Sequence, residues 1–104
     1  MPTYTMGVDI GSTTSKCIIM KDGTEIVSTS LIVGGTGTNG QLKTVEEALE
    51  CASLKMEDIS AVIATGYGRK ALHIADNDVS ELSCHAKGVH FLFPDVRTII
   101  DIGG

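Results

Sequence analysis

The stretch Gly7-Val8-Asp9-Ile10-Gly11-Ser12-Thr13-Thr14-Ser15-Lys16 decides the fold of this chain. Residues 3–10 have the composition of a β-strand, and residues 15–20 form a second strand-like run after a short turn. Two strands joined by so few residues must run antiparallel. Asp9 is therefore predicted to lie at the end of the first strand, immediately before a tight turn of glycine and small hydroxylated residues.

This turn is a candidate site for a metal ion and a phosphate group. A carboxylate at a strand end, such as Asp9, can hold Mg²⁺ through water while backbone amides and hydroxyl groups of the turn contact phosphate oxygens. The turn residues are Gly11, Ser12, Thr13 and Thr14. Lys16 adds a positive charge just beyond them. The alternative interpretation is an ordinary hairpin in which Asp9 accepts hydrogen bonds from turn amides and Lys16 is solvated.

A third strand and a helix are predicted after the hairpin. Residues 25–33 are strand-like and follow an Asp22-Gly23 pair, which is a strong signal for a hairpin turn. After a glycine-rich loop at residues 34–40, apolar side chains recur at spacings of three and four over residues 42–52. The first three strands should therefore form an antiparallel meander, and an amphipathic helix should follow them.

The second half of the sequence alternates strand and helix. Residues 60–65 form a short apolar run suited to a buried parallel strand. Apolar side chains at helical spacing over residues 79–93 predict a second helix, with Asp78 as its N-cap and Glu81 as the other member of a capping box. Residues 97–102 predict the last strand.

The predicted order is β-β-β-α-β-α-β, an α/β fold with a mixed five-stranded sheet. Helical crossovers return the chain to its starting edge, so the last two strands should lie parallel to the first. The carboxyl ends of these three strands then share the edge where ligands of open α/β sheets usually bind. The last strand contains Asp101 and ends in Gly103-Gly104, so Asp9 and Asp101 are expected to face each other across one site.

Composition limits the kinds of partner. The 104 residues suffice for one domain, and 42% hydrophobic residues are typical of a globular chain. The net charge is −5 and the basic residues are scattered, so nucleic acids and anionic membranes are poor partners. The sequence has no apolar run of membrane-spanning length and no apolar signal core at its start, which predicts a cytoplasmic protein.

Two further patterns point to less specific chemistry. Cys17, Cys51 and Cys84 are widely spaced, so they are interpreted as buried, reduced thiols rather than as disulfide partners or zinc ligands. Residues 35–40 match the dinucleotide pattern G-x-G-x-x-G, but the next strand ends at Gly66 without the acidic residue that such a site requires. This segment is therefore interpreted as a mobile loop.

Four segments together resemble a known family. The resemblance is to the ATPase activators of 2-hydroxyacyl-CoA dehydratases, which are related to the benzoyl-CoA reductase ATPase subunits, and it covers the whole chain. It implies an actin-like, ribonuclease H-like fold, as in the superfamily of acetate kinase, sugar kinases, Hsp70 and actin. The segments are G-V-D-I-G-S-T-T-S-K at residues 7–16, A-T-G-Y-G-R at 64–69, S-E-L-S-C-H-A at 80–86 and T-I-I-D-I-G-G at 98–104.

The resemblance implies that this chain is one part of a larger enzyme system. Such activators are homodimers that share one [4Fe-4S] cluster, hydrolyse ATP and pass an electron from a ferredoxin or flavodoxin to a dehydratase component. Family members continue past the second aspartate motif into the cluster cysteines and the half that covers adenosine. Residues 1–104 are therefore expected to be the N-terminal ATPase subdomain of a longer activator, with the cluster ligands outside this chain.

The resemblance also assigns roles to single residues. Asp9 and Asp101 would coordinate Mg²⁺ at the phosphates of ATP, directly or through water. Glu81 would orient the attacking water, although the capping box already explains a glutamate at that position. The residues expected to bind the phosphates are Gly11, Ser12, Thr13, Thr14, Lys16, Gly103 and Gly104.

Two other functions stay open from the sequence. One is phosphotransfer to a small molecule, as in the sugar and acetate kinases of the same superfamily. The other is a non-catalytic interaction module that uses its last strand as an exposed edge. The loop at residues 65–69, in which glycines flank Tyr67 and Arg69 follows, is equally well interpreted as a docking surface or as a solvated turn.

Overall fold

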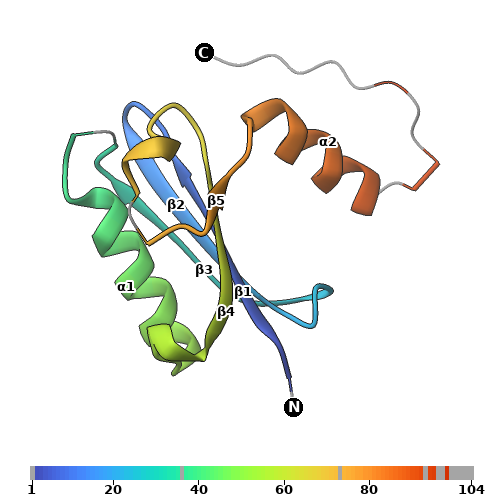
Figure 1. The fold of residues 1–104 in the computed structure, drawn as a ribbon, viewed down its shortest axis with the longest axis horizontal. Helices are drawn as coiled ribbons and strands as arrows, with labels where there is room; N and C mark the ends of the chain where they lie inside the picture. Colours follow the sequence, from blue (N-terminus) through green and yellow to red (C-terminus); the bar gives the residue numbers. More distant parts are fainter. Residues whose placement is uncertain (1, 36, 73, 93, 96–97, 99–104) are drawn as a thin grey trace.

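The computed structural model describes residues 2–35, 37–72, 74–92, 94, 95 and 98, and its centre is a five-stranded sheet with helix α1 packed against one face (Figure 1). The strands lie in the order β3-β2-β1-β4-β5. The elements are β1 (Tyr4–Ile10), β2 (Thr14–Lys21), β3 (Glu25–Val33), α1 (Gly40–Ala52), β4 (Ile59–Thr65), β5 (Asn77–Asp78), α2 (Glu81–Leu92) and two short 3-10 turns, η1 (Met56–Asp58) and η2 (Arg69–Ala71).

The pairing of the strands confirms the predicted mixed sheet. β1, β2 and β3 form the antiparallel meander, while β4 lies parallel to β1 on its other side. Asp22 and Gly23 both have positive φ in the turn between β2 and β3, as the two central residues of a type I′ β-turn require, and the amide of Thr24 closes this turn with a 3.2 Å hydrogen bond to the carbonyl oxygen of Lys21. β1 thus occupies the middle of the sheet, and its carboxyl end is flanked by the β1–β2 turn and by the end of β4.

The hydrophobic core lies between the sheet and α1. Alternate side chains of the central strands point to α1, among them Val8 and Ile10 of β1 and Ile19 of β2, which are almost completely buried. Val45 and Ala48 supply the facing surface of the helix. Because successive side chains of a strand point to opposite faces, Asp9 and Lys16 lie on the face away from α1.

Hydrogen bonds from hydroxyl groups also join α1 to the sheet. Ser28 of β3 donates a buried 2.8 Å hydrogen bond to the carbonyl oxygen of Ala48. Ser30 donates one of 2.6 Å to the carbonyl oxygen of Thr44, and its hydroxyl also contacts the Thr44 hydroxyl. These bonds satisfy polar groups inside the interface and fix the position of the helix along β3.

The start of the second helix corrects the sequence analysis. α2 begins at Glu81, and Asp78 belongs to β5, which pairs with β4 in parallel. The hydroxyl of Ser80 accepts a 3.3 Å hydrogen bond from the amide of Ser83, so Ser80 caps the helix. The predicted capping box of Asp78 and Glu81 is wrong because pairing with β4 holds Asp78 in the sheet.

The fifth strand also differs from the expected one. The two residues of β5 are too short a run to give a sequence signal, yet they pair with Ile63 and Ala64 of β4. The strand predicted at residues 97–102 lies outside the described residues, with only Thr98 described among them. None of the described helices is long and apolar enough to cross a membrane.

The three cysteines occupy different environments, so the expectation of three buried thiols is wrong. Cys17 is buried between the sheet and α1, Cys84 is half-buried, and Cys51 is exposed on the last turn of α1. Burial removes water from the Cys17 thiol and raises its pKa from 9.0 to about 12. The thiolate of Cys17 is therefore scarce near neutral pH.

Two isoleucines of the β2–β3 hairpin test the position of the core. Ile19 is 0% exposed and Ile26 is 60% exposed. Ile19→Ala leaves a cavity and should lower the free energy of unfolding by about 2–5 kcal/mol, whereas Ile26→Ala should change it by no more than about 0.5 kcal/mol. Urea denaturation of the 104-residue chain measures both. Equal losses would contradict the placement of the core.

The cysteines allow a chemical test of the same fold. At about pH 8.5, iodoacetamide should modify Cys51 readily and Cys17 only after denaturation, as read from peptide masses. The raised pKa of Cys17 means that the folded state favours the neutral thiol. The buried Cys17 thiol therefore contributes fully to the stability of the fold below pH 9.0, and this contribution is lost as the pH rises towards about 12. Fast modification of native Cys17 would show that this strand is not buried.

Candidate functional site

The loop between β3 and α1 packs against the turn between β1 and β2 and supports it. The amide of Gly34 donates a 2.8 Å hydrogen bond to the carbonyl oxygen of Thr13. The Ser15 hydroxyl donates one of 2.8 Å to the carbonyl oxygen of Gly34. Gly35 is buried against the turn, where a Cβ atom would lie 2.1 Å from the carbonyl oxygen of Gly11. Only glycine permits this approach, so the two loops form one rigid unit.

This support explains the G-x-G-x-x-G pattern of residues 35–40. β3 is antiparallel to β2 at the edge of the sheet, whereas a dinucleotide fingerprint follows a strand of a parallel βαβ unit. The Thr38 hydroxyl donates to the carbonyl oxygen of Gly35 at 2.7 Å and accepts from the amide of Gly40 at 3.1 Å. The described part of the loop thus braces the β1–β2 turn.

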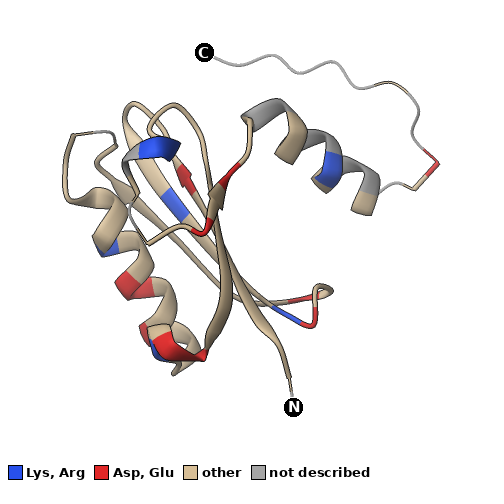
Figure 2. Ribbon diagram, in the orientation of Figure 1, with Lys and Arg blue, Asp and Glu red and all other residues tan. Residues whose placement is uncertain are grey.

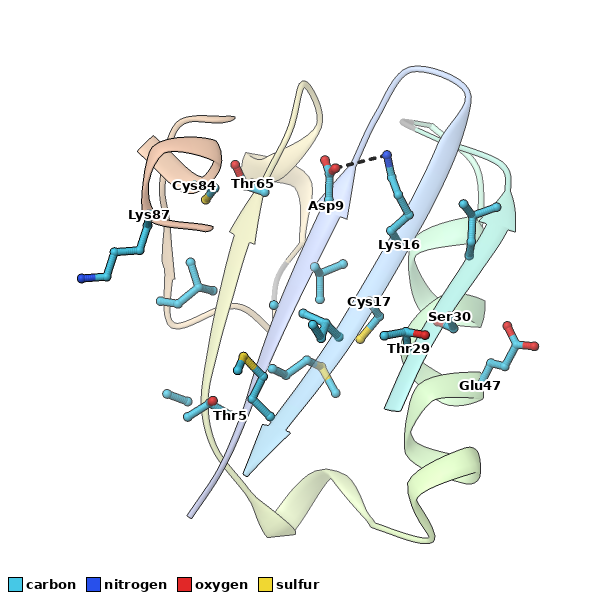
Figure 3. A pocket seen from close by; sticks show the side chains of 18 residues that line it. Thr5, Asp9, Lys16, Cys17, Thr29, Ser30, Glu47, Thr65, Cys84 and Lys87 are labelled. Atoms are coloured by element: carbon cyan, nitrogen blue, oxygen red, sulfur yellow. Dashed lines mark ion pairs between the residues drawn. The ribbon is translucent and has the colours of Figure 1, made fainter. Parts of the chain in front are cut away.

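Asp9 and Lys16 form an ion pair at the carboxyl end of β1. The two residues are register partners, and Lys16 Nζ lies 3.2 Å from Asp9 Oδ2 (Figure 3). The other carboxylate oxygen, Oδ1, is buried and has no hydrogen-bond partner among the described residues. A buried carboxylate oxygen without a partner is costly, so the Asp9 carboxylate is a candidate ligand for a bound cation or its water.

The turn after β4 covers the unpaired oxygen. Gly66 is buried with φ of +91°, and a Cβ atom on it would lie 2.4 Å from Asp9 Oδ1. The amide of Gly68 donates a 2.8 Å hydrogen bond to the carbonyl oxygen of Ile10, which attaches this turn to the end of β1. Sequence analysis missed this contact. Its signal was a Gly-x-Gly sequence directly after a strand predicted to run parallel to β1.

Thr65 connects the same edge to the start of α2. It pairs with Asp9 across the parallel ladder, and its hydroxyl donates a 2.6 Å hydrogen bond to the carbonyl oxygen of Val79. Oppositely charged side chains pair at two places near this edge, between β1 and β2 and between η2 and β5, and Figure 2 colours the charged positions along these elements. The second pair is Arg69 with Asp78, at 3.2 Å.

A hollow of about 1100 Å³ extends from the Asp9–Lys16 pair over the sheet face away from α1 (Figure 3). Its polar end is formed by Asp9, Lys16 and Thr65. The rest is lined largely by apolar side chains of the sheet, such as Ile18 and Ile63, with Cys84 and Lys87 of α2 at one side. The Asp9–Lys16 ion pair and Thr65 thus meet at the end of the hollow at the carboxyl edge of β1, whereas the polar side chains of Thr29, Glu47 and Lys87 line other parts of it.

The structure brings together one half of the predicted site. Asp9, Lys16 and the turn residues 11–14 lie together at one edge of the sheet. Glu81 is the first residue of α2. Asp101, Gly103 and Gly104 lie outside the described residues, so the predicted convergence of Asp9 and Asp101 stays a prediction.

Comparison with known families agrees with this geometry. The model of the BadF/BadG/BcrA/BcrD ATPase family matches residues 6–104. The chain belongs to this family. The four segments on which the predicted resemblance rested lie inside the match, and the first of them, residues 7–16, contains the turn described above.

Relatives of this family member are activators of dehydratases. The (R)-2-hydroxyglutaryl-CoA dehydratase activating ATPase of Acidaminococcus fermentans is 57% identical over 105 residues, which are 100% of this chain and 40% of the relative. The activator of lactoyl-CoA dehydratase of Anaerotignum propionicum is 52% identical, over 97% of this chain and 39% of the relative. The chain thus spans about two fifths of the length of these curated relatives.

The fold of this family member matches two solved structures. Component A of the Acidaminococcus fermentans dehydratase superimposes with a TM-score of 0.91 at 57% identity, over 98% of this chain and 40% of that chain. The activator of the 2-hydroxyisocaproyl-CoA dehydratase from Clostridium difficile, with bound ADPNP, gives 0.91 at 53% identity, over 98% and 38%. These neighbours confirm the predicted actin-like, ribonuclease H-like class.

A pair of glycine variants tests the contact between Gly66 and Asp9. Gly66 and Gly23 both have positive φ, but the space around a Cβ atom is open only at Gly23. Gly23→Ala should lower the free energy of unfolding by about 1–2 kcal/mol through backbone strain alone. Gly66→Ala should cost more, because the methyl group also displaces the Asp9 carboxylate. Equal losses in thermal or urea denaturation would show that Gly66 does not pack on Asp9.

Proposed function

We propose that the chain binds the phosphates of ATP, with Mg²⁺, as the N-terminal subdomain of an ATPase that activates a 2-hydroxyacyl-CoA dehydratase. The observation that carries the proposal is the Asp9 carboxylate at the end of β1, with Oδ1 buried and unpaired among the described residues and Oδ2 facing Lys16, beside a turn of small hydroxylated residues. The proposal is supported by the shared fold of an activator that was solved with bound ADPNP.

The β1–β2 turn would hold the phosphate groups. Ser12 and Thr13 are exposed at the tip of the turn, so their hydroxyl groups can reach phosphate oxygens. The loop at Gly34 and Gly35 holds the backbone of the turn in place before ligand arrives. Such preorganisation avoids the cost of ordering a loop around each ligand.

The carboxylate of Asp9 suits Mg²⁺, which prefers oxygen ligands and retains several waters. When bound, Mg²⁺ would neutralise charge on the phosphates and polarise the bond that hydrolysis breaks. Lys16 now neutralises Asp9 Oδ2 at 3.2 Å. The Lys16 ammonium lies on the same face of the sheet and would supply positive charge to a phosphate oxygen.

The remainder of the proposal concerns the complete protein. Its Asp101 would be the second carboxylate of the cation site, Gly103 and Gly104 a second phosphate turn, and Glu81 the group that orients the attacking water. By analogy with the activators, we propose a cytoplasmic homodimer that shares a [4Fe-4S] cluster and passes electrons from a ferredoxin or flavodoxin to the dehydratase. The names of the relatives favour this role over a sugar or acetate kinase.

Replacement of Asp9 tests the proposed cation site. In the complete gene product, Asp9→Asn should lower the affinity for Mg²⁺-ATP at least tenfold in calorimetry and remove most ATP hydrolysis, because an amide cannot replace a carboxylate as a Mg²⁺ ligand. Asp22→Asn is the matched control, since Asp22 lies in the β2–β3 turn at the other end of β2 and its Oδ1 accepts a hydrogen bond from Thr3. Wild-type affinity and turnover in Asp9→Asn would refute the proposal.

A further inference from the structure

Both carboxylate oxygens of Asp9 lie close to neighbouring groups, although only Oδ2 is paired with one among the described residues. Oδ2 faces Lys16 at 3.2 Å, and Oδ1 is buried under the backbone of Gly66. A cation that approaches Asp9 must therefore displace Lys16 from Oδ2 or move the Gly66 turn away from Oδ1. The position of this turn decides which carboxylate oxygen a ligand can reach.

Arg69 holds the Gly66 turn through hydrogen bonds to the carbonyl oxygen of Gly66. Its backbone amide and its guanidinium both donate to the carbonyl oxygen of Gly66, at 3.2 Å and 3.3 Å. Its Nε donates to Asp78 Oδ1 at 3.2 Å. Asp78 itself is fixed in β5 by its pairing with Ala64 of β4. The guanidinium thus joins the turn to a strand of the sheet through two hydrogen bonds with different partners.

The neighbouring lysine does not share this role. Lys70 Nζ lies 4.0 Å from Asp78 Oδ1, and its side chain is 78% exposed, against 32% for Arg69. A lysine carries one compact donor group, whereas the guanidinium presents separate donors to the Gly66 carbonyl and to Asp78. Arg69 therefore bonds to both the Gly66 carbonyl oxygen and Asp78, whereas Lys70 lies 4.0 Å from Asp78 with an exposed side chain.

We propose that Arg69 and Asp78 form a clamp that holds the Gly66 turn over Asp9, and that Arg69 is a positioning residue for cation binding. The inference rests on the proposed function of Asp9. With Oδ1 covered, the clamp presents Oδ2 alone to an incoming cation, and cation binding is then obligatorily coupled to release of Lys16. A free turn would let the carboxylate rotate and present either oxygen, which weakens the site.

The clamp makes a prediction that a merely structural ion pair does not. Partly exposed ion pairs contribute little to global stability, so its removal should leave the melting temperature nearly unchanged. Residues that orient a metal-binding side chain commonly affect metal affinity by roughly 10–100-fold. Loss of the clamp should therefore appear in cation affinity rather than in unfolding.

The test is a Mn²⁺ titration of the complete gene product saturated with ADP, followed by electron paramagnetic resonance, with Mn²⁺ in place of Mg²⁺. Arg69→Met and Asp78→Asn should each raise the dissociation constant for Mn²⁺ about tenfold. The double variant should be no weaker than the weaker single variant, because the two residues act as one unit. Arg69→Lys should recover little of the loss.

Two controls separate the clamp from general loosening. Lys70→Met removes the neighbouring charge. Asp76→Ala removes the 2.6 Å hydrogen bond from the amide of Val62 to Asp76 Oδ2, which ties the same segment to β4 away from Gly66. Both should bind Mn²⁺ within twofold of wild type, and Asp76→Ala is expected to show the lower melting temperature because it leaves a backbone amide unpaired.

The outcomes distinguish the clamp from the function on which it rests. If Asp9→Asn loses Mn²⁺ binding while Arg69→Met and Asp78→Asn stay within twofold of wild type, the clamp is wrong and the proposed function stands. If Asp76→Ala weakens binding as much as Arg69→Met, the effect is general loosening and the clamp is again wrong. If Asp9→Asn binds Mn²⁺ like wild type, the cation site and the clamp both fail.

Discussion

The antiparallel pairing of β1 with β2 is the constraint on which the rest of this structure depends. It places Asp9 opposite Lys16 at the end of the central strand and leaves three residues to reverse the chain. The parallel pairing of β4 with β1 then brings a glycine turn onto the same carboxylate. A single edge of the sheet therefore collects the charged pair, the hydroxylated turn and the buried oxygen.

The two faces of the sheet have different roles, since one packs against α1 and the other carries the Asp9–Lys16 pair, and both arise from the same strands. Of the side chains that alternate with Asp9 and Lys16, those of Val8, Ile10 and Cys17 belong to the core on the α1 side, while the buried Ser15 hydroxyl bonds to the loop that supports the site. The core positions the strands, and the strands position the charges. Changes on the α1 side therefore act on the site through strand position, whereas changes at the carboxyl edge act on it directly.

Local patterns predicted most of the fold and half of the site. The Asp22-Gly23 pair, the spacing of apolar residues in α1 and the hydroxylated turn after Asp9 each carry their own signal, and each lies where the sequence analysis placed it. β5 and the Ser80 cap were missed because they depend on pairing with β4, which two residues of sequence cannot indicate. The contact of Gly66 with Asp9 joins residues 57 positions apart, and only the packed sheet brings them together.

The hydroxyl bonds between β3 and α1 have a consequence for how the molecule tolerates changes of loop length. A helix held by apolar contacts alone can slide along a sheet with a small loss of stability. Hydrogen bonds from Ser28 and Ser30 to carbonyl oxygens of α1 are directional, so they fix the position of the helix along β3. An insertion or deletion between Val33 and Gly40 cannot then be absorbed by movement of the helix. It would instead displace Gly35, which packs tightly against the β1–β2 turn. The length of this loop is therefore constrained, although most of its described residues face solvent.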